Sequence, residues 1–371
     1  MQEGGSKVLD NGKISSKQFA LLVTVFTIGS SILYIPSFIA SEAKQDAWLS
    51  SIMGVALGLL IISLYHRVGT MFPNMTLVQY SEKILGKWFG KLLSVLFCIH
   101  FYLLSGLVLR NIGDYLITLL LPQTPIQAVH ILSLCIIIMG ARLGIETVAR
   151  MAELLFPILI LFYLMAMIGL IPEVELIKLQ PVFENGFKPI LRGIIPYVGS
   201  PSLELVVFLM IIPFMNRTDS VKKSFLTGGL MGGISLTIPL FYCLTVLGPE
   251  LTAANTFASF TVTKKINIGD FYQRIDVVIA GVAFICVYFK ATLCFYASLL
   301  GLAQTFHLKD YRFLSYPMGM ILIVFSIVAY PNSSYAASFF KDTWMPYAAT
   351  FGLFLPLLLW VVAAVRKKYV Q

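Results

Sequence analysis

Residues 26–36 read FTIGSSILYIP and interrupt what is otherwise an apolar run from residue 17 to residue 40. Glycine weakens a helix because it has the largest backbone entropy to lose, and Gly29 is followed directly by two serines. Pro36 removes a further backbone hydrogen bond, the one that residue 36 would donate to residue 32. The stretch predicts a broken helix, with Gly29, Ser30 and Ser31 at the break.

A second interrupted stretch, PYVGSPSLE, covers residues 196–204 in the middle of the apolar run 188–215. Two prolines five residues apart, with a glycine and two serines around them, make a continuous α-helix improbable there. Irregular backbone at membrane depth is tolerated where it is buried in protein or lines a cavity. We therefore expect Gly199, Ser200, Pro201 and Ser202 to face protein or a cavity.

Around these stretches the 371-residue chain is 58% hydrophobic and only 12% charged. A soluble domain is about 25% charged, so the composition indicates a membrane protein. The hydropathy pattern predicts an all-α polytopic protein with about ten transmembrane helices and no separate soluble domain. The predicted spans are residues 17–40, 47–65, 92–120, 126–142, 146–171, 188–215, 224–248, 272–302, 312–330 and 338–365.

Charge in the connecting segments predicts the orientation. Most of the 27 lysine and arginine residues fall on the side that carries both termini, which by the positive-inside rule is the cytoplasm. Residues 70–90 on that side read as an amphipathic helix. Residues 172–187 form an acidic loop on the other side, and residues 249–270 form another segment there, with room for a short helix.

The two breaks fall in spans one and six of ten, which is the pattern of a five-plus-five inverted repeat. We expect one repeat over about residues 14–171 and the other over about 188–366. In such folds two discontinuous helices frame a binding site near the membrane midplane, where freed N–H groups and helix N-termini can receive an anionic group. A simple proline kink in each span is the alternative reading.

Charged residues inside the spans are few, and each is a candidate for function. Glu204 follows the second break and Lys290 lies in the middle of span eight; they either line a polar cavity or form a buried pair that locks two helices together. Arg110 and Asp114, four residues apart on span three, favour an interfacial pair or an outer gate. Tyr102 and Ser105 on the same span are further candidates for lining the cavity.

Signatures of enzymes are absent from the sequence. It holds no P-loop, HExxH or GxSxG motif, and its five cysteines show no metal-ligand spacing. We therefore expect a protein that is not an enzyme and needs no cofactor or metal.

Several segments, in their order and spacing, resemble the B subunit of the GerA-type spore germinant receptors, a branch of the amino acid–polyamine–organocation (APC) transporter superfamily. The resemblance covers about residues 14–368. The segments that carry it are GSSILYIP (29–36), FPNMTLVQYSEKILGKWFGK (72–91), TPIQ (124–127), LQPVFENGFKPILRG (179–193) and LFLPLLLWVVAAV (353–365).

The resemblance implies a LeuT/APC-type core in the inner membrane of a bacterial spore. It also implies a complex with an A subunit and a lipoprotein C subunit, and the sensing of a small nutrient such as an amino acid. In APC relatives the two breaks hold the amino and carboxyl groups of the ligand. Here Ser30 and Ser31 follow a single glycine, so their side chains leave less room for a ligand to approach the backbone.

Three functions are open at this point. The chain binds a small nutrient between broken helices one and six and signals germination, or it is a proton-coupled amino acid transporter of the APC superfamily. The third possibility is a scaffold that has lost ligand binding. The residues expected to bind the ligand are Gly29, Ser30, Ser31, Tyr102, Ser105, Gly199, Ser200, Pro201, Ser202, Glu204 and Lys290.

Overall fold

The computed structural model describes residues 10–266 and 275–369, and within them the secondary structure is helical throughout, with a single isolated β-bridge between Ile14 and Met215. Eight segments of the described chain are long and apolar enough to cross a membrane, and one of them, Ser31–Thr70, contains two consecutive helices. Two shorter apolar helices are Ser16–Ile28 and Arg312–Val328. Each of the ten predicted spans coincides with one or more of these helices, although residues 272–274 of the eighth predicted span lie outside the described part.

The first half of the chain forms the first five predicted spans and one connecting helix. Its helices are α1 (Ser16–Ile28), α2 (Ser31–Ala43), α3 (Ala47–Thr70), α4 (Leu77–Leu85), α5 (Lys87–Leu119), α6 (Ile126–Leu143) and α7 (Ile145–Leu170). The short α4 is the amphipathic helix expected within residues 70–90, because its apolar side chains are buried against α5.

The second half is more irregular. Its α-helices are α8 (Phe187–Tyr197), α9 (Val221–Tyr242), α10 (Pro249–Ala254), α11 (Ala258–Thr263), α12 (Ile275–Thr305), α13 (Ser315–Val328), α14 (Ser333–Phe339), α15 (Met345–Ala349) and α16 (Leu355–Tyr369). The described residues also form the π-helical turns η4 (Val198–Ser202), η8 (Cys243–Leu247), η11 (Phe340–Trp344) and η12 (Thr350–Phe354). The 3₁₀ helices are η5 (Leu203–Met210) and the short η6 (Ile212–Phe214), η7 (Thr218–Ser220) and η10 (Arg312–Leu314). The short α10 and α11 occupy the predicted segment 249–270, whose residues 267–270 lie outside the described part.

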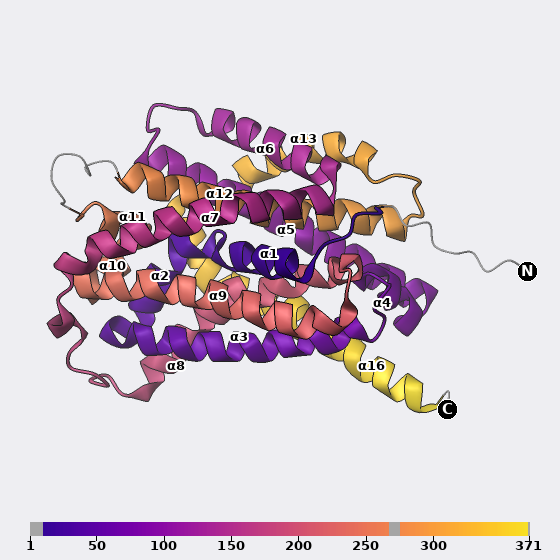
Figure 1. The fold of residues 1–371 in the computed structure, drawn as a ribbon, viewed down its shortest axis with the longest axis horizontal. Coiled ribbons are helices and arrows are strands. Elements are labelled where there is room, and N and C mark those ends of the chain that lie inside the picture. The colour runs from indigo at the N-terminus through magenta and orange to yellow at the C-terminus, as the bar shows by residue number, and fades with distance from the viewer. Residues whose placement is uncertain (1–9, 267–274, 370–371) are drawn as a thin grey trace, which may run out of the picture.

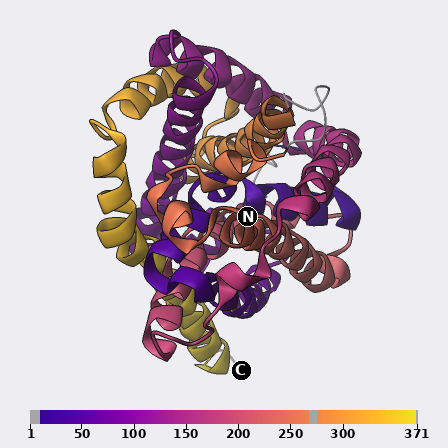
Figure 2. The ribbon, with the colours of Figure 1, turned by 90° about the vertical axis from the view of Figure 1, so that its left-hand side faces the viewer.

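The long helices run side by side in one bundle (Figure 1). The start of α1, the short α4 and the end of α16 lie at one end of it, which we call the terminal end. The short α10 and α11 lie at the opposite end, which we call the loop end. Helices α1 and α2 run near the centre of the bundle, as the end-on view shows (Figure 2).

Burial follows from this arrangement. The side chains of α1 from Leu21 to Thr27 are all buried, and α1 packs against α7, α9 and α12. A helix that is apolar on every side is stable only when protein or lipid surrounds it. The apolar side chains that remain exposed, such as Leu132, Leu154 and Val324, lie on helices at the periphery, as expected for a lipid-facing surface.

The first span is interrupted at the predicted place. Gly29 has φ 25° and ψ −133°, a conformation that a residue with a side chain rarely adopts. Helix α1 therefore ends at Ile28 and α2 starts again at Ser31. Pro36 lies inside α2, which continues through it to Ala43.

The sixth span departs from the α-helix in another way. Helix α8 ends at Tyr197, but the backbone of Val198, Ser202 and Leu203 stays in the right-handed helical region. The chain first widens into the π-helical turn and then tightens into the 3₁₀ helix η5. The second predicted break is thus a change of helical pitch in a chain that stays helical from Val198 to Met210.

Candidate functional site

A cavity of about 730 Å³ lies between the two irregular spans. It is lined by residues of α2, the middle of α5, α8, the π-helical turn η4, the start of η5, the end of α10 with the segment after it, and the start of the last span. Pockets for small ligands have volumes of about 300–1,000 Å³. The uncharged polar side chains in its wall, besides those of Tyr34 and Trp344, are Ser30, Ser31, Ser37, Ser41, Asn111, Ser200, Thr256 and Ser338.

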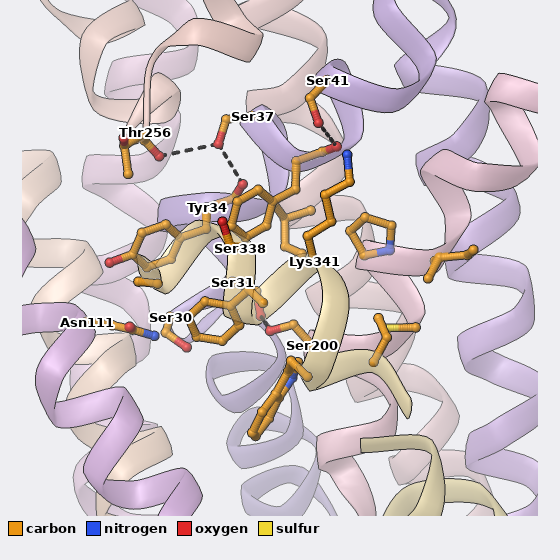
Figure 3. Close-up of a pocket in the computed structure, with 18 of the residues that line it drawn as sticks. Ser30, Ser31, Tyr34, Ser37, Ser41, Asn111, Ser200, Thr256, Ser338 and Lys341 are labelled. Atoms are coloured by element: carbon orange, nitrogen blue, oxygen red, sulfur yellow. Dashed lines mark hydrogen bonds between the residues drawn. The ribbon is translucent and has the colours of Figure 1, made fainter. Parts of the chain in front are cut away.

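The two irregular spans meet directly at the cavity. Ser31 starts α2 and Ser200 lies in the π-helical turn, and their hydroxyl oxygens are 3.2 Å apart, within hydrogen-bond distance (Figure 3). Both serines line the cavity, as does Glu204 one turn further along the sixth span. The local breaks in the sequence therefore place three polar groups from two spans around one space.

Glu204 forms an ion pair with Lys290 of α12, in which Lys290 Nζ is 2.5 Å from Glu204 Oε2. The Lys290 side chain is fully buried and the Glu204 side chain is 3% exposed. The stem of Lys290 packs against Gly29, and its Nζ lies 5.4 Å from the centre of the Phe26 ring. Lys290 thus connects the first break, the sixth span and α12, but it does not line the cavity.

A second buried ion pair lies beside the cavity on α5. Arg110 Nε donates to both carboxylate oxygens of Asp114, at 3.0 and 3.1 Å. The guanidinium also donates to the carbonyl of Ile327 at 2.8 Å and lies over the ring of Tyr330. Asp114 lines the cavity and Arg110 does not. The expectation of a pair on one helix face is confirmed.

Aromatic rings form much of the remaining wall. The ring of Tyr34 packs against those of Phe257 and Phe340, with centroids 5.3 and 6.1 Å apart. Trp344, in the π-helical turn η11, also lines the cavity and is a neighbour of the Glu204 carboxylate. The site therefore combines a few polar groups with flat apolar faces, the usual composition of a small-molecule pocket.

Charged residues surround the cavity at the loop end. Lys341 Nζ is 2.7 Å from Glu42 Oε1, and this pair joins the end of α2 to the start of the last span. Lys341 points toward this region in Figure 3. Arg192 and Asp342 line the same part of the cavity and are exposed. The cavity therefore extends from the Glu42–Lys341 pair inward to Glu204.

Four of the predicted site residues, Ser30, Ser31, Ser200 and Glu204, line the cavity. Gly29 and Lys290 lie in contact with each other behind it.

The other predicted site residues face neighbouring helices. Tyr102 donates to the carbonyl of Met318, and Ser105 donates to the carbonyl of Ala291. Gly199 packs against Met345, and Ser202 packs against Gly58. Pro201 is buried in the π-helical turn. Whether any of these residues contacts a ligand remains a prediction.

Sequence reasoning did not single out Tyr34, Asn111, Phe257, Trp344 or Met345, which also line the cavity. Tyr34 lies one turn after the first break, and that proximity was the one available signal. Trp344 and Met345 sit in an apolar run, where a residue facing a cavity has the same pattern as a residue facing lipid. Phe257 lies in the connecting segment 249–270, and Asn111 is a polar residue inside an apolar span, a signal that went unused.

Comparison with known proteins identifies relatives along nearly the whole chain. The family model described as "Spore germination protein" matches residues 13–334. Spore germination protein KB of Bacillus subtilis (strain 168) is 31% identical over 369 residues, covering 97% of this chain and 97% of that protein. Spore germination protein B2 of the same organism is 23% identical, with 96% of each chain covered.

Two solved structures share the fold. One is Mhp1, a nucleobase-cation-symport-1 family transporter in a closed conformation with bromovinylhydantoin bound; its TM-score is 0.71 at 11% identity, covering 97% of this chain and 80% of that one. The other is MhsT in complex with L-phenylalanine, with a TM-score of 0.66 at 14% identity, covering 92% and 88%. Both have the LeuT-type fold, so the predicted fold class is confirmed. None of the named matches is an enzyme, in agreement with the sequence.

Proposed function

We propose that this chain, which belongs to the spore germination protein family, binds a small nutrient in the cavity between its two irregular spans. Membership of that family makes it a multi-pass, permease-like membrane protein of the germinant-receptor B type. The nutrient we expect is an amino acid. Binding favours one arrangement of the two repeats, and the preference passes to partner subunits. A ligand shifts such an equilibrium only by its difference in affinity for the two states.

One observation supports this proposal most strongly. The Ser31 and Ser200 hydroxyls, which come from the two breaks, lie 3.2 Å apart on the wall of a cavity large enough for an amino acid. The start of α2 at Ser31 places helix N–H groups and their positive dipole end at the same point. A ligand carboxylate there would interact with the first span, and the rest of the ligand would lie against the sixth and last spans.

The proposal extends to the assembly and its location. We place the chain in the inner membrane of the spore with both termini in the cytoplasm, together with an A subunit and a lipoprotein C subunit. The terminal end of the bundle then faces the cytoplasm and the Glu42–Lys341 pair faces outward. A nutrient arriving from outside would meet the charged residues of the loop end before it reaches Glu204.

The test is a germination screen of spores in which this chain is the only B subunit, over amino acids, sugars and nucleosides. Ser200→Phe adds a ring to the cavity wall and should abolish the response to the active nutrient. Cys135→Phe is the matched control, because Cys135 lies exposed on α6 away from the cavity, and its response should equal that of the parent chain. An equal response in both variants contradicts the proposed site.

A second measurement separates a sensor from a transporter. The purified chain in liposomes is given the active nutrient in labelled form, with and without a proton gradient. We expect binding without accumulation inside the liposomes. Gradient-driven accumulation would show that the chain is a proton-coupled transporter and would contradict a purely sensory role.

A further inference from the structure

The charged residues that line the cavity do not balance one another. Within the described residues they are four acids, Glu42, Asp114, Glu204 and Asp342, and two bases, Arg192 and Lys341. The bases lie only at the loop end, where solvent screens them. The deep wall shows carboxylates alone, so a ligand would meet a formal excess of two negative charges if nothing else were present.

Two cations behind the wall remove this excess. Lys290 is 2.5 Å from Glu204 and Arg110 is 3.0 Å from Asp114, and neither cation lines the cavity. Each approaches its carboxylate from the protein side. Lys290 packs against Gly29 and Phe26, and Arg110 binds backbone carbonyls of α13. Each deep carboxylate is therefore already paired before any ligand arrives.

A buried site that is balanced in this way selects against net charge. A ligand with a net positive charge would lose its hydration and find both deep carboxylates already neutralised. A ligand with a net negative charge would also lose its hydration, and the two deep cations that could compensate for it lie behind the carboxylates and are already paired. A neutral polar molecule or a zwitterion has no such penalty. Its separated charges can still interact with the start of α2 and with the edge of Glu204.

We infer that the cavity is specific for ligands with no net charge, and that Lys290 and Arg110 determine this specificity from behind the wall as counter-ions of Glu204 and Asp114. The inference rests on the proposed function for the existence of a ligand. Beyond the proposed function, it specifies the net charge of that ligand and assigns the selection to Lys290 and Arg110, which do not contact the ligand.

The test compares ligands that share one skeleton and differ in charge. L-leucine is a zwitterion at pH 7, L-leucinamide is a cation and N-acetyl-L-leucine is an anion; the alanine series provides the same three charges in a smaller molecule. The purified full-length chain in lipid nanodiscs is titrated with each compound, and affinity is obtained from the dose-dependent rise of the unfolding temperature. For the parent chain we expect the zwitterion to bind most tightly in any series that binds.

Removing one buried cation should change the order of preference. Lys290→Met leaves Glu204 without a counter-ion, and the affinity ratio of leucinamide to leucine should rise by at least about tenfold over that of the parent chain. Lys17→Met is the matched control. It also removes the lysine of an ion pair, the pair with Glu153, but at an exposed position of the terminal end, and the ratio should not change.

Two further variants keep the inference testable if Lys290→Met does not fold. Glu204→Gln leaves Lys290 unpaired and should shift preference toward N-acetyl-leucine. In the double variant Glu204→Gln with Lys290→Met, neither residue of the pair is charged, and the zwitterion should again bind most tightly. A variant series that keeps the parental order throughout, or a parent chain that prefers either charged compound, overturns the inference.

This design distinguishes the inference from the proposed function. If the parent chain binds none of the compounds, the proposed amino acid ligand is contradicted for these two side chains. A gain of leucinamide binding in Lys290→Met would then still support the counter-ion role, and no gain would overturn it.

Discussion

The first and sixth spans both stop being α-helical near the cavity, but through different residues and with different geometry. At Gly29 the backbone leaves the helical region altogether, and two separate helices result. At Val198–Ser202 the backbone remains helical and only its hydrogen-bond spacing changes. Both interruptions carry a glycine, so residue type alone does not reveal which kind occurs.

The two glycines have different roles. Gly29 is needed for its dihedral angles and also because a Cβ atom there would collide with Lys290 and lie 2.7 Å from the carbonyl of Phe26. Gly199 lies in the π-helical turn without the positive φ of Gly29, and the three atoms nearest to a Cβ atom there all belong to the side chain of Met345. The first break is therefore a property of the backbone itself, whereas the second depends on its neighbours.

The largest effect is expected at the first break. Gly29→Ala combines an unfavourable dihedral with overpacking, each of which typically costs about 1–3 kcal/mol, so the free energy of unfolding should fall by about 3 kcal/mol or more. Gly281→Ala is the matched control, since no atom lies within 4 Å of the added carbon in α12. Unfolding in detergent, followed by tryptophan fluorescence, measures both variants.

Shortening the neighbour should not rescue Gly29→Ala. In the double variant with Lys290→Ala, the contact with the Phe26 carbonyl and the dihedral penalty both remain. Full recovery of stability in the double variant would show that side-chain packing alone fixes the first break and would remove the contrast between the two spans.

The second effect concerns the packing of the sixth span. Gly199→Ala should lower the free energy of unfolding by about 1–3 kcal/mol through overpacking against Met345. Combining it with Met345→Ala should recover part of that loss, because the obstacle is a flexible side chain. A double-mutant cycle measures the coupling, and strictly additive effects would contradict this account of the second break.

The third effect concerns a buried hydroxyl on α3 that connects the sixth span to the last span. The Tyr65 hydroxyl lies 2.9 Å from the carbonyl oxygen of Leu203 and 2.6 Å from that of Gly352. Tyr65→Phe leaves these buried groups without their donor, at a cost of about 1–2 kcal/mol. The exposed Tyr335 provides the control variant Tyr335→Phe. Equal unfolding curves for the two variants would show that Tyr65 does not support the sixth span.

The smallest effect is expected where the two spans touch. Ser200→Ala removes the hydroxyl that bonds to Ser31, a bond at the cavity wall that should contribute about 0.5–1.5 kcal/mol. Ser63→Ala, which removes a local bond to the carbonyl of Leu59 on α3 away from the cavity, is the control. The stability of Ser200→Ala should change little while nutrient affinity falls, and a large loss of stability would assign the hydroxyl pair a mainly structural role.

The same contrast explains how far the sequence could predict the fold. Hydropathy located every span, and the Gly-Ser-Ser stretch located the first break, because both depend on properties of neighbouring residues in the chain. The pitch change in the sixth span could be placed but not described. Its form depends on Tyr65, Met345 and Gly352, which are distant in sequence.

The candidate site was predictable to a similar extent. Serines and a glutamate next to prolines and a glycine are unusual inside apolar spans, and this signalled Ser30, Ser31, Ser200 and Glu204. Tyr102 and Ser105 gave the same signal but bond to the backbone of neighbouring helices. The boundaries of the two repeats, near residues 14–171 and 188–366, remain a prediction.

The central claim is that the nutrient occupies the space between the two breaks, and thiol protection tests it most directly. Ser200→Cys is introduced with Cys135→Ala, since Cys135 is exposed and Cys98, Cys243, Cys286 and Cys294 are buried, whereas Ser200 is partly exposed on the cavity wall. A small membrane-impermeant thiol reagent is applied from the loop end, with and without the nutrient that triggers germination. We predict that position 200 is labelled and that the nutrient slows labelling in proportion to its occupancy. Labelling that proceeds at the same rate with saturating nutrient would contradict the claim.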